Sequence, residues 1–114
     1  MIKKYVNHVE KLLINEQKIQ LKLKIDEDLF WFQGHFEQHP ILAGVVQVDW
    51  VIHYFHQFLD SEKIFDGLVN VKFQQPIIPN EEIVLTLEYD KEKKYLVFQY
   101  EARDVKSKGK MRLK

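Results

Sequence analysis

The sequence predicts an α+β fold in which an antiparallel β-sheet packs against one long helix. Two segments, 18–26 and 83–90, alternate apolar and polar residues, which is the pattern of strands with one buried face. Between them, 43–60 is too long for a typical strand and has no proline, and no glycine after Gly44. This segment predicts a helix of about four to five turns. A single helix placed between strands is typical of an α+β protein.

The other elements follow from shorter patterns and from the turns between them. Strands are expected at 5–14, 18–26, 68–75, 83–90, 95–104 and 108–114. Turns are expected at 15–17, at the proline-containing 76–82 and at the charged 91–94. The lysine-rich tail 108–114 predicts an edge strand, because lysines discourage pairing with other chains. The sheet is therefore expected to have about five or six strands.

On a helical wheel, 43–60 has a broad apolar arc and a narrower polar stripe. The arc is expected to pack on the sheet, and it consists of Val48, Val51, Ile52, Phe55, Phe58 and Leu59. The stripe consists of Asp49, His53, His56 and Gln57. It can be a solvated face, or it can hold a local Asp49–His53 pair at i,i+4 spacing, which would favour the ionised carboxylate.

The composition is that of a globular protein and excludes several functions. Seventeen basic residues balance seventeen acidic ones, so there is no general attraction to nucleic acid or to an anionic membrane. The absence of cysteine excludes disulfides and thiolate chemistry and is consistent with a reducing cytoplasm. The sequence predicts neither a signal peptide nor a membrane-spanning run. We expect a single domain, 1–114, that is soluble and cytoplasmic.

The segment 31–50 concentrates the chemically special residues, including both tryptophans and two of the five histidines. His35 follows Gly34 and precedes Pro40, so it is expected in irregular backbone, where functional side chains are often displayed. The alternative is an ordinary exposed histidine. Gly44 is expected at the helix start, where the first N–H groups lack helical partners and a substrate oxygen could approach closely. The alternative is that Gly44 only turns the chain.

Metal and nucleotide sites are not expected. His35 and His39 lie in a segment that is not helical, and His53 and His56 have only Asp49 nearby as a third ligand. Neither an HExxH motif nor cysteine supports zinc, and no glycine-rich phosphate motif occurs.

The stretch "FQGHFEQHPILAGVVQVDW" resembles the signature of the β-hydroxyacyl-acyl carrier protein dehydratases, the FabZ/FabA group of hot-dog proteins. Matching positions without gaps are Phe32, Gly34, His35, Phe36, Pro40, Ile41, Gly44, Val45 and Asp49. Glu37 and Ala43 stand where the family commonly has proline, and Asp49 is the FabA-like choice over glutamate. The segment 71–90 resembles the sheet half of the same fold, and "HPILAGVVQVDW" is similar to the ApeI-type dehydratases of aryl polyene clusters.

The resemblance implies a hot-dog fold, in which a curved antiparallel β-sheet wraps around one long central helix. It implies a homodimer, or a heterodimer with a related hot-dog subunit, in which His35 of one subunit faces Asp49 of the other. The implied reaction is dehydration of a 3-hydroxyacyl thioester, carried by acyl carrier protein, to a trans-2-enoyl thioester in fatty acid or aryl polyene-type biosynthesis. Such acid–base elimination requires no cofactor and no metal.

Roles carry over to three residues. His35 is implied as the base that removes the α-proton, the Gly44 N–H as the donor to the thioester carbonyl, and Asp49 as the group that assists loss of the β-hydroxyl, directly or through water. The acid role needs an apolar tunnel, because desolvation raises the pKa of a carboxyl group. Candidate lining residues are Phe36, Pro40, Ile41, Val45, Val48, Trp50 and His53. The alternatives are a hot-dog acyl-thioesterase and a noncatalytic acyl-binding or assembly subunit.

Overall fold

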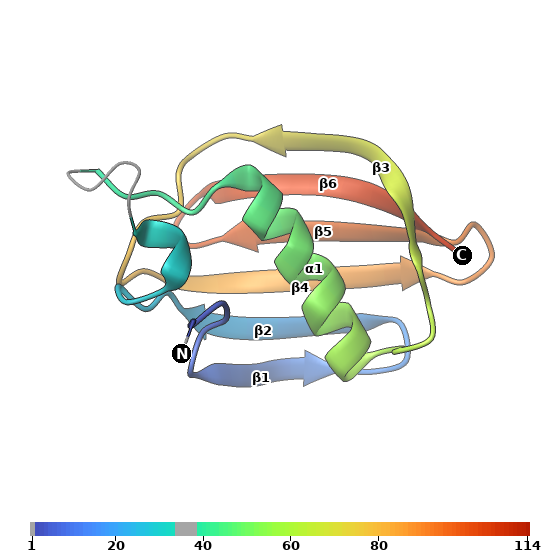
Figure 1. Cartoon of the computed structure of the whole chain (residues 1–114). Coiled ribbons are helices and arrows are strands. Elements are labelled where there is room, and N and C mark those ends of the chain that lie inside the picture. Colours follow the sequence, from blue (N-terminus) through green and yellow to red (C-terminus); the bar gives the residue numbers. More distant parts are fainter. Residues whose placement is uncertain (1, 34–38) are drawn as a thin grey trace.

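The computed structural model describes residues 2–33 and 39–114, and its strands form one six-stranded antiparallel sheet (Figure 1). The strands are β1 (Val9–Ile14), β2 (Lys18–Lys24), β3 (Phe65–Phe73), β4 (Glu82–Asp90), β5 (Tyr95–Glu101) and β6 (Val105–Leu113). The helices are the short 3-10 helix η1 (Phe30–Phe32) and α1 (Gly44–Phe58). The spatial order β1-β2-β4-β5-β6-β3 leaves β1 and β3 at the edges. The predicted α+β class is confirmed.

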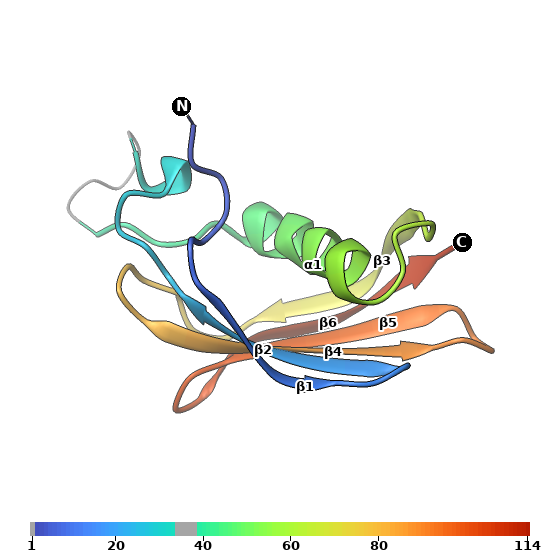
Figure 2. The same cartoon turned by 90° about the horizontal axis from the view of Figure 1, so that it is seen from below.

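The sheet curves around α1, which lies against its concave face (Figure 2). The helix starts on the side of β3 and β6 and ends on the side of β1 (Figure 1). The N-terminal segment and η1 lie on the same side of the sheet as the helix, beside its first half (Figure 2). Within residues 2–33 and 39–114, no helix is long and apolar enough to cross a membrane.

The period-two patterns produce the core. Leu21 of β2 pairs with Leu85 of β4, which in turn pairs with Tyr100 of β5, and all three side chains are fully buried. Neighbouring positions along each of these strands alternate between buried and more exposed. Alternation on three adjacent strands therefore places one continuous apolar surface under the helix.

The predicted turns are confirmed where a polar side chain caps the backbone. Asn15 Oδ1 accepts hydrogen bonds from the N–H groups of Gln17 and Lys18, at 2.9 and 2.8 Å, which closes the β1–β2 hairpin. Such Asx turns replace backbone partners that a tight connection leaves free. In the 76–82 connection, Asn80 has a φ of 70°, a left-handed value that asparagine tolerates better than most residues.

Three strand predictions need correction. The prediction of an edge strand at 108–114 is wrong, because β6 starts at Val105 and lies between β5 and β3. Gly109 shows how it fits there: an added Cβ would lie 2.7 Å from both the Asn70 carbonyl oxygen and Phe98 Cζ, on the two neighbouring strands. In addition, β3 starts at Phe65 rather than at 68, and β1 starts at Val9 rather than at residue 5.

The helix is confirmed, but its buried arc is rotated relative to the wheel prediction. Val48 and Ile52 are only half-buried, whereas Trp50 and Tyr54 are almost fully buried. The buried side chains of α1 are Val46, Gln47, Trp50, Val51, Tyr54 and Phe55. Two large aromatic side chains determine this orientation, because they bury more area than the valine and isoleucine they displace. Val48 and Ile52 consequently lie between the sheet-facing side and the solvent-facing side of α1.

Candidate active site

The start of α1 is an uncapped helix N-terminus. Ala43 is extended and offers no side-chain hydrogen bond, and the first turn holds no acidic residue. The N–H groups of Val46 and Gln47 both reach the Ala43 carbonyl oxygen, at 3.0 and 3.1 Å. The positive end of the helix is therefore not neutralised by a local carboxylate, and it suits an oxygen with developing negative charge.

Gly44 lies close to an aromatic ring. The positive-φ glycine among the described residues is Gly67, so the turn-only interpretation of Gly44 has no support from its backbone angles. An added Cβ at Gly44 would lie 2.5 Å from Phe73 Cζ, on the edge strand β3. The two residues line a pocket of about 250 Å³, whose other lining residues are Ile41, Leu42, Gln47, Gln74, Gln75 and Pro76. The structure thus brings the predicted residues Ile41 and Gly44 together beside the edge strand β3.

Asp49 lies farther along α1 and is exposed. Its Oδ2 accepts a hydrogen bond from the hydroxyl of Tyr5, at 3.2 Å. No hydrogen bond or ion pair joins Asp49 to His53, although both lie in the described part of the protein, so the i,i+4 pair is not formed. The sequence did not single out Tyr5, because an isolated tyrosine 44 positions before its partner carries no local signal.

The two helix histidines have defined partners. The ring of His53 stacks on Tyr5, with centroids 3.7 Å apart and planes 10° from parallel. Burial lowers the pKa of His53, and nearby His56 acts in the same direction, while Asp49 opposes both. His56 Nε2 lies 2.7 Å from the Lys63 carbonyl oxygen. Among residues 2–33 and 39–114, no group of three histidine, cysteine, aspartate or glutamate side chains could hold a metal ion.

The remaining predicted residues differ in their surroundings. His35 and Phe36 lie outside the described residues. Val45 is 78% exposed, Ile41 is exposed, and Pro40, Val48 and His53 are half-buried. Trp50 is fully buried, and its indole N–H donates to the Lys4 carbonyl oxygen at 3.1 Å, a place that suits the core better than a substrate tunnel.

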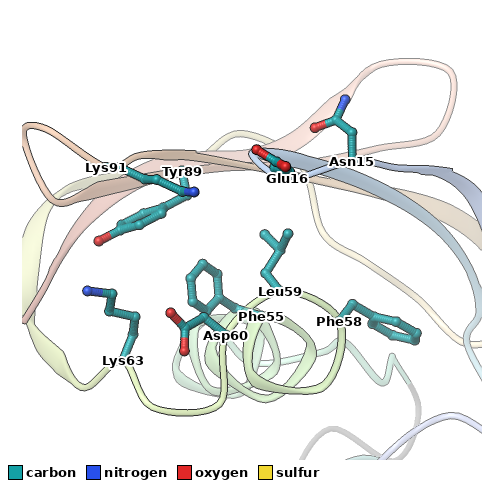
Figure 3. A pocket seen from close by; sticks show the side chains of 9 residues that line it. All are labelled: Asn15, Glu16, Phe55, Phe58, Leu59, Asp60, Lys63, Tyr89 and Lys91. Carbon is teal, nitrogen blue, oxygen red and sulfur yellow. The ribbon is translucent and has the colours of Figure 1, made fainter.

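A larger cavity, of about 750 Å³, lies at the opposite end of α1 (Figure 3). Phe55, Leu59 and Tyr89 form its apolar part, and Lys63 and Lys91 stand at its margin. It does not include Gly44 or Asp49. This cavity is therefore separate from the residues that the signature selects.

A curved antiparallel sheet around a single helix is the hot-dog fold, and solved structures support this class. A subunit of the dehydratase heterocomplex ApeI:P from Xenorhabdus doucetiae is 36% identical, with a TM-score of 0.85 and a match that covers 94% of both proteins. Mouse thioesterase superfamily member 2 is 16% identical, with a TM-score of 0.66. That match covers 90% of the present protein and 78% of the thioesterase, and it shows the fold alone.

The sequence comparison identifies the family. Residues 10–110 match the ApeI-like family model, described as ApeI dehydratase, and the chain therefore belongs to the ApeI-like family. The 3-hydroxyacyl-[acyl-carrier-protein] dehydratase FabZ of Desulfotalea psychrophila is 27% identical over 77 residues. That match covers 60% of the present protein and about half, 51%, of the relative.

Proposed function

We propose that this protein catalyses the dehydration of a 3-hydroxyacyl thioester carried by acyl carrier protein. The observation that carries the proposal is the placement of the signature on α1: Gly44 is its first residue, and Asp49 is exposed on the same helix. Membership of the ApeI-like family supports the same reaction. A cytoplasmic location, and a role in fatty acid or aryl polyene-type synthesis, are parts of this proposal that rest on composition and on the resemblance.

The reaction is an elimination in which each proposed residue has one role. His35 removes the α-proton, and the electron pair forms the double bond. The uncapped N–H at Gly44 binds the thioester carbonyl oxygen and stabilises the charge that develops on it. The β-hydroxyl leaves as water, with a proton delivered by Asp49 or by a water that Asp49 holds.

Asp49 needs a second subunit, because it is exposed in a single one. The edge strand β3, whose outer edge is free in the described sheet, is the proposed contact surface, since Leu68, Val69 and Phe73 are 46%, 43% and 50% exposed there. A free strand edge with apolar side chains is a surface on which another strand can pair. Phe73 also contacts the start of α1, so a partner on β3 would lie beside Gly44. We propose a homodimer, or a heterodimer with a related hot-dog subunit.

An activity assay tests the reaction. Purified protein is given 3-hydroxyacyl and acyl thioesters of several chain lengths on acyl carrier protein, while enoyl product and free thiol are followed. We expect enoyl product, and we expect His35→Ala and Asp49→Ala each to lower kcat/KM by about 10²- to 10⁴-fold. His39→Ala and Asp60→Ala are the matched controls and should keep full activity. Thiol release without enoyl product would indicate a thioesterase, and neither product would indicate a noncatalytic subunit.

Mixing the two inactive variants tests whether the site is shared between subunits. If His35 and Asp49 come from different subunits of a homodimer, exchange between the variants creates dimers with one intact site. Random exchange should then restore about a quarter of the wild-type activity. Light scattering of the same samples checks that the protein is dimeric. No recovery from a dimeric, exchanging sample would argue against the shared site.

A further inference from the structure

Tyr5 contacts two polar side chains of α1, Asp49 and His53. Its hydroxyl donates to Asp49 Oδ2 at 3.2 Å, and its ring stacks on His53 at 3.7 Å between centroids. The ring of Tyr5 also lies 6.4 Å from those of Trp50 and Tyr54. The hydroxyl therefore reaches the carboxylate from a ring that is held on more than one side.

The backbone around Tyr5 is held by hydrogen bonds from η1 and α1. We name residues 2–7 the N-terminal strap. The Lys4 carbonyl oxygen in the strap accepts hydrogen bonds from the indole N–H groups of both Trp31 and Trp50, at 2.8 and 3.1 Å. The sequence has two tryptophans, and both are committed to this one carbonyl. The Lys4 carbonyl oxygen is bonded to both η1 and α1, which restricts the backbone of the next residue, Tyr5.

Further contacts anchor the strap on either side of Lys4. The Phe30 N–H donates to the Lys3 carbonyl oxygen at 2.8 Å, and the Lys3 ammonium lies 2.7 Å from Asp28. The Asn7 N–H donates to Asp26 Oδ2 at 2.9 Å. These bonds all lead to the connection between β2 and α1, so the strap is anchored next to the start of the signature.

The charges around the hydroxyl keep it a donor. Burial raises the pKa of Tyr5, and the charge of Asp49 and the hydrogen bond to it raise it further. The hydroxyl therefore stays protonated at neutral pH. Burial lowers the pKa of His53, so the neutral ring that stacks on Tyr5 is favoured over the imidazolium. An imidazolium would compete with Tyr5 for Asp49. Among the described residues, Tyr5 is thus the side chain that donates a hydrogen bond to the Asp49 carboxylate.

We propose that Tyr5 is a positioning residue for Asp49, whose hydroxyl holds Oδ2 so that Oδ1 faces the substrate hydroxyl or the water that leaves. This inference rests on the proposed function. Tyr5 keeps its proton throughout and touches no reacting atom. With one carboxylate oxygen held, the Asp49 side chain has fewer rotamers available and loses less conformational entropy when it adopts the productive geometry. Small misplacements of a catalytic group also lower the rate strongly.

The test uses Tyr5→Phe in the protein of residues 1–114, since phenylalanine keeps the stacked ring and removes only the hydroxyl. We expect kcat to fall by about tenfold while KM stays within about twofold, because the lost interaction acts on the chemical step. Tyr95 lies on β5 with the Lys110 ammonium over its ring, and Tyr95→Phe is the matched control that should keep the wild-type kcat. Thermal unfolding of both variants verifies that each is folded.

A double variant separates positioning from a general structural effect. In the Asp49→Asn background, Tyr5→Phe should lower the residual kcat by less than about twofold, since the carboxylate it positions is already gone. A tenfold loss in that background as well would overturn the inference, because Tyr5 would then act elsewhere. A normal kcat for Tyr5→Phe, in a wild-type protein that forms enoyl product, would overturn it while leaving the proposed function intact. A wild-type protein without enoyl product would overturn both.

Discussion

Two polar clusters lie on opposite sides of α1, and they differ in how completely their hydrogen bonds are satisfied. On the side of α1 that faces the sheet, Gln47 is 3% exposed. Its side-chain amide N–H donates to the Leu42 carbonyl oxygen at 2.9 Å, and its side-chain oxygen accepts from Ser107 Oγ at 2.6 Å. On the other side of the helix, Asp49 is exposed, and within residues 2–33 and 39–114 it accepts one side-chain hydrogen bond, from Tyr5.

The difference separates a structural cluster from one that can react. The Gln47 backbone carbonyl also accepts from the buried Tyr100 hydroxyl at 2.6 Å, so the buried cluster connects α1, β5 and β6. Its groups have partners and are almost fully buried, and a fully satisfied buried network fixes one arrangement. Asp49 keeps oxygen lone pairs that a substrate can use. Two residues that are two positions apart in the sequence therefore serve opposite purposes.

The largest difference between the two clusters is expected in how much they contribute to stability. Gln47→Met keeps the side-chain volume but leaves the Ser107 hydroxyl and the Leu42 carbonyl without their partners, and we expect a loss of about 2–4 kcal/mol in the free energy of unfolding. Asp49→Asn should change it by less than about 0.5 kcal/mol. Urea unfolding measures both values. Equal losses for the two variants would contradict the division into a structural and a reactive cluster.

An intermediate effect is expected at Gly44. In Gly44→Ala, the new Cβ would meet the tip of the half-exposed Phe73 ring, which can move aside, so stability should change by less than about 1 kcal/mol. The methyl group still crowds the helix N-terminus, and we expect enoyl formation to fall by roughly ten- to a hundredfold. In the double variant with Phe73→Ala, activity should stay low. Recovery of activity in the double variant would show that Gly44 is required only to leave room for the Phe73 ring.

The smallest effect concerns the acid dependence of stability. Burial is the main reason that the pKa of His53 lies below the ordinary 6.5, with His56 adding to it and Asp49 opposing it. The folded protein then binds this proton less tightly than the unfolded chain, so stability is retained above the ordinary value and falls as the pH drops below it. His53→Phe keeps a ring on Tyr5 and removes this contribution. Between pH 7.5 and 5.5, Tm should fall less in the variant, by on the order of 1–2 °C. An identical fall in both proteins would exclude the contribution of His53.

Local sequence patterns predicted the helices and strands of this fold, but not which strands lie next to one another in the sheet. The alternation in β2 and β4, the single helix and the helix start at Gly44 follow from residues within a few positions of each other. The place of β6 between β5 and β3 does not, because strand order depends on pairing across the whole chain. A lysine-rich strand can still be internal when its lysines lie on the exposed face of the sheet.

The candidate site was predicted in part for the same reason. The signature selected Gly44 and Asp49 through fixed spacing within one segment. Tyr5 was missed because it meets Asp49 from 44 positions away. Gln47 falls in neither the polar stripe nor the apolar arc of the wheel, and its partners Tyr100 and Ser107 are 53 and 60 positions away. Contacts of this kind become visible only when the chain is folded.

The bonding of both tryptophans to one carbonyl oxygen has an optical consequence. Indole emission depends on the hydrogen bonding and polarity around the ring, and here both indoles sense the same short piece of backbone. Detachment of residues 2–7 would alter the environment of every tryptophan in the molecule at once, while the sheet could remain intact. Intrinsic tryptophan fluorescence therefore reports whether residues 2–7 are bound to η1 and α1.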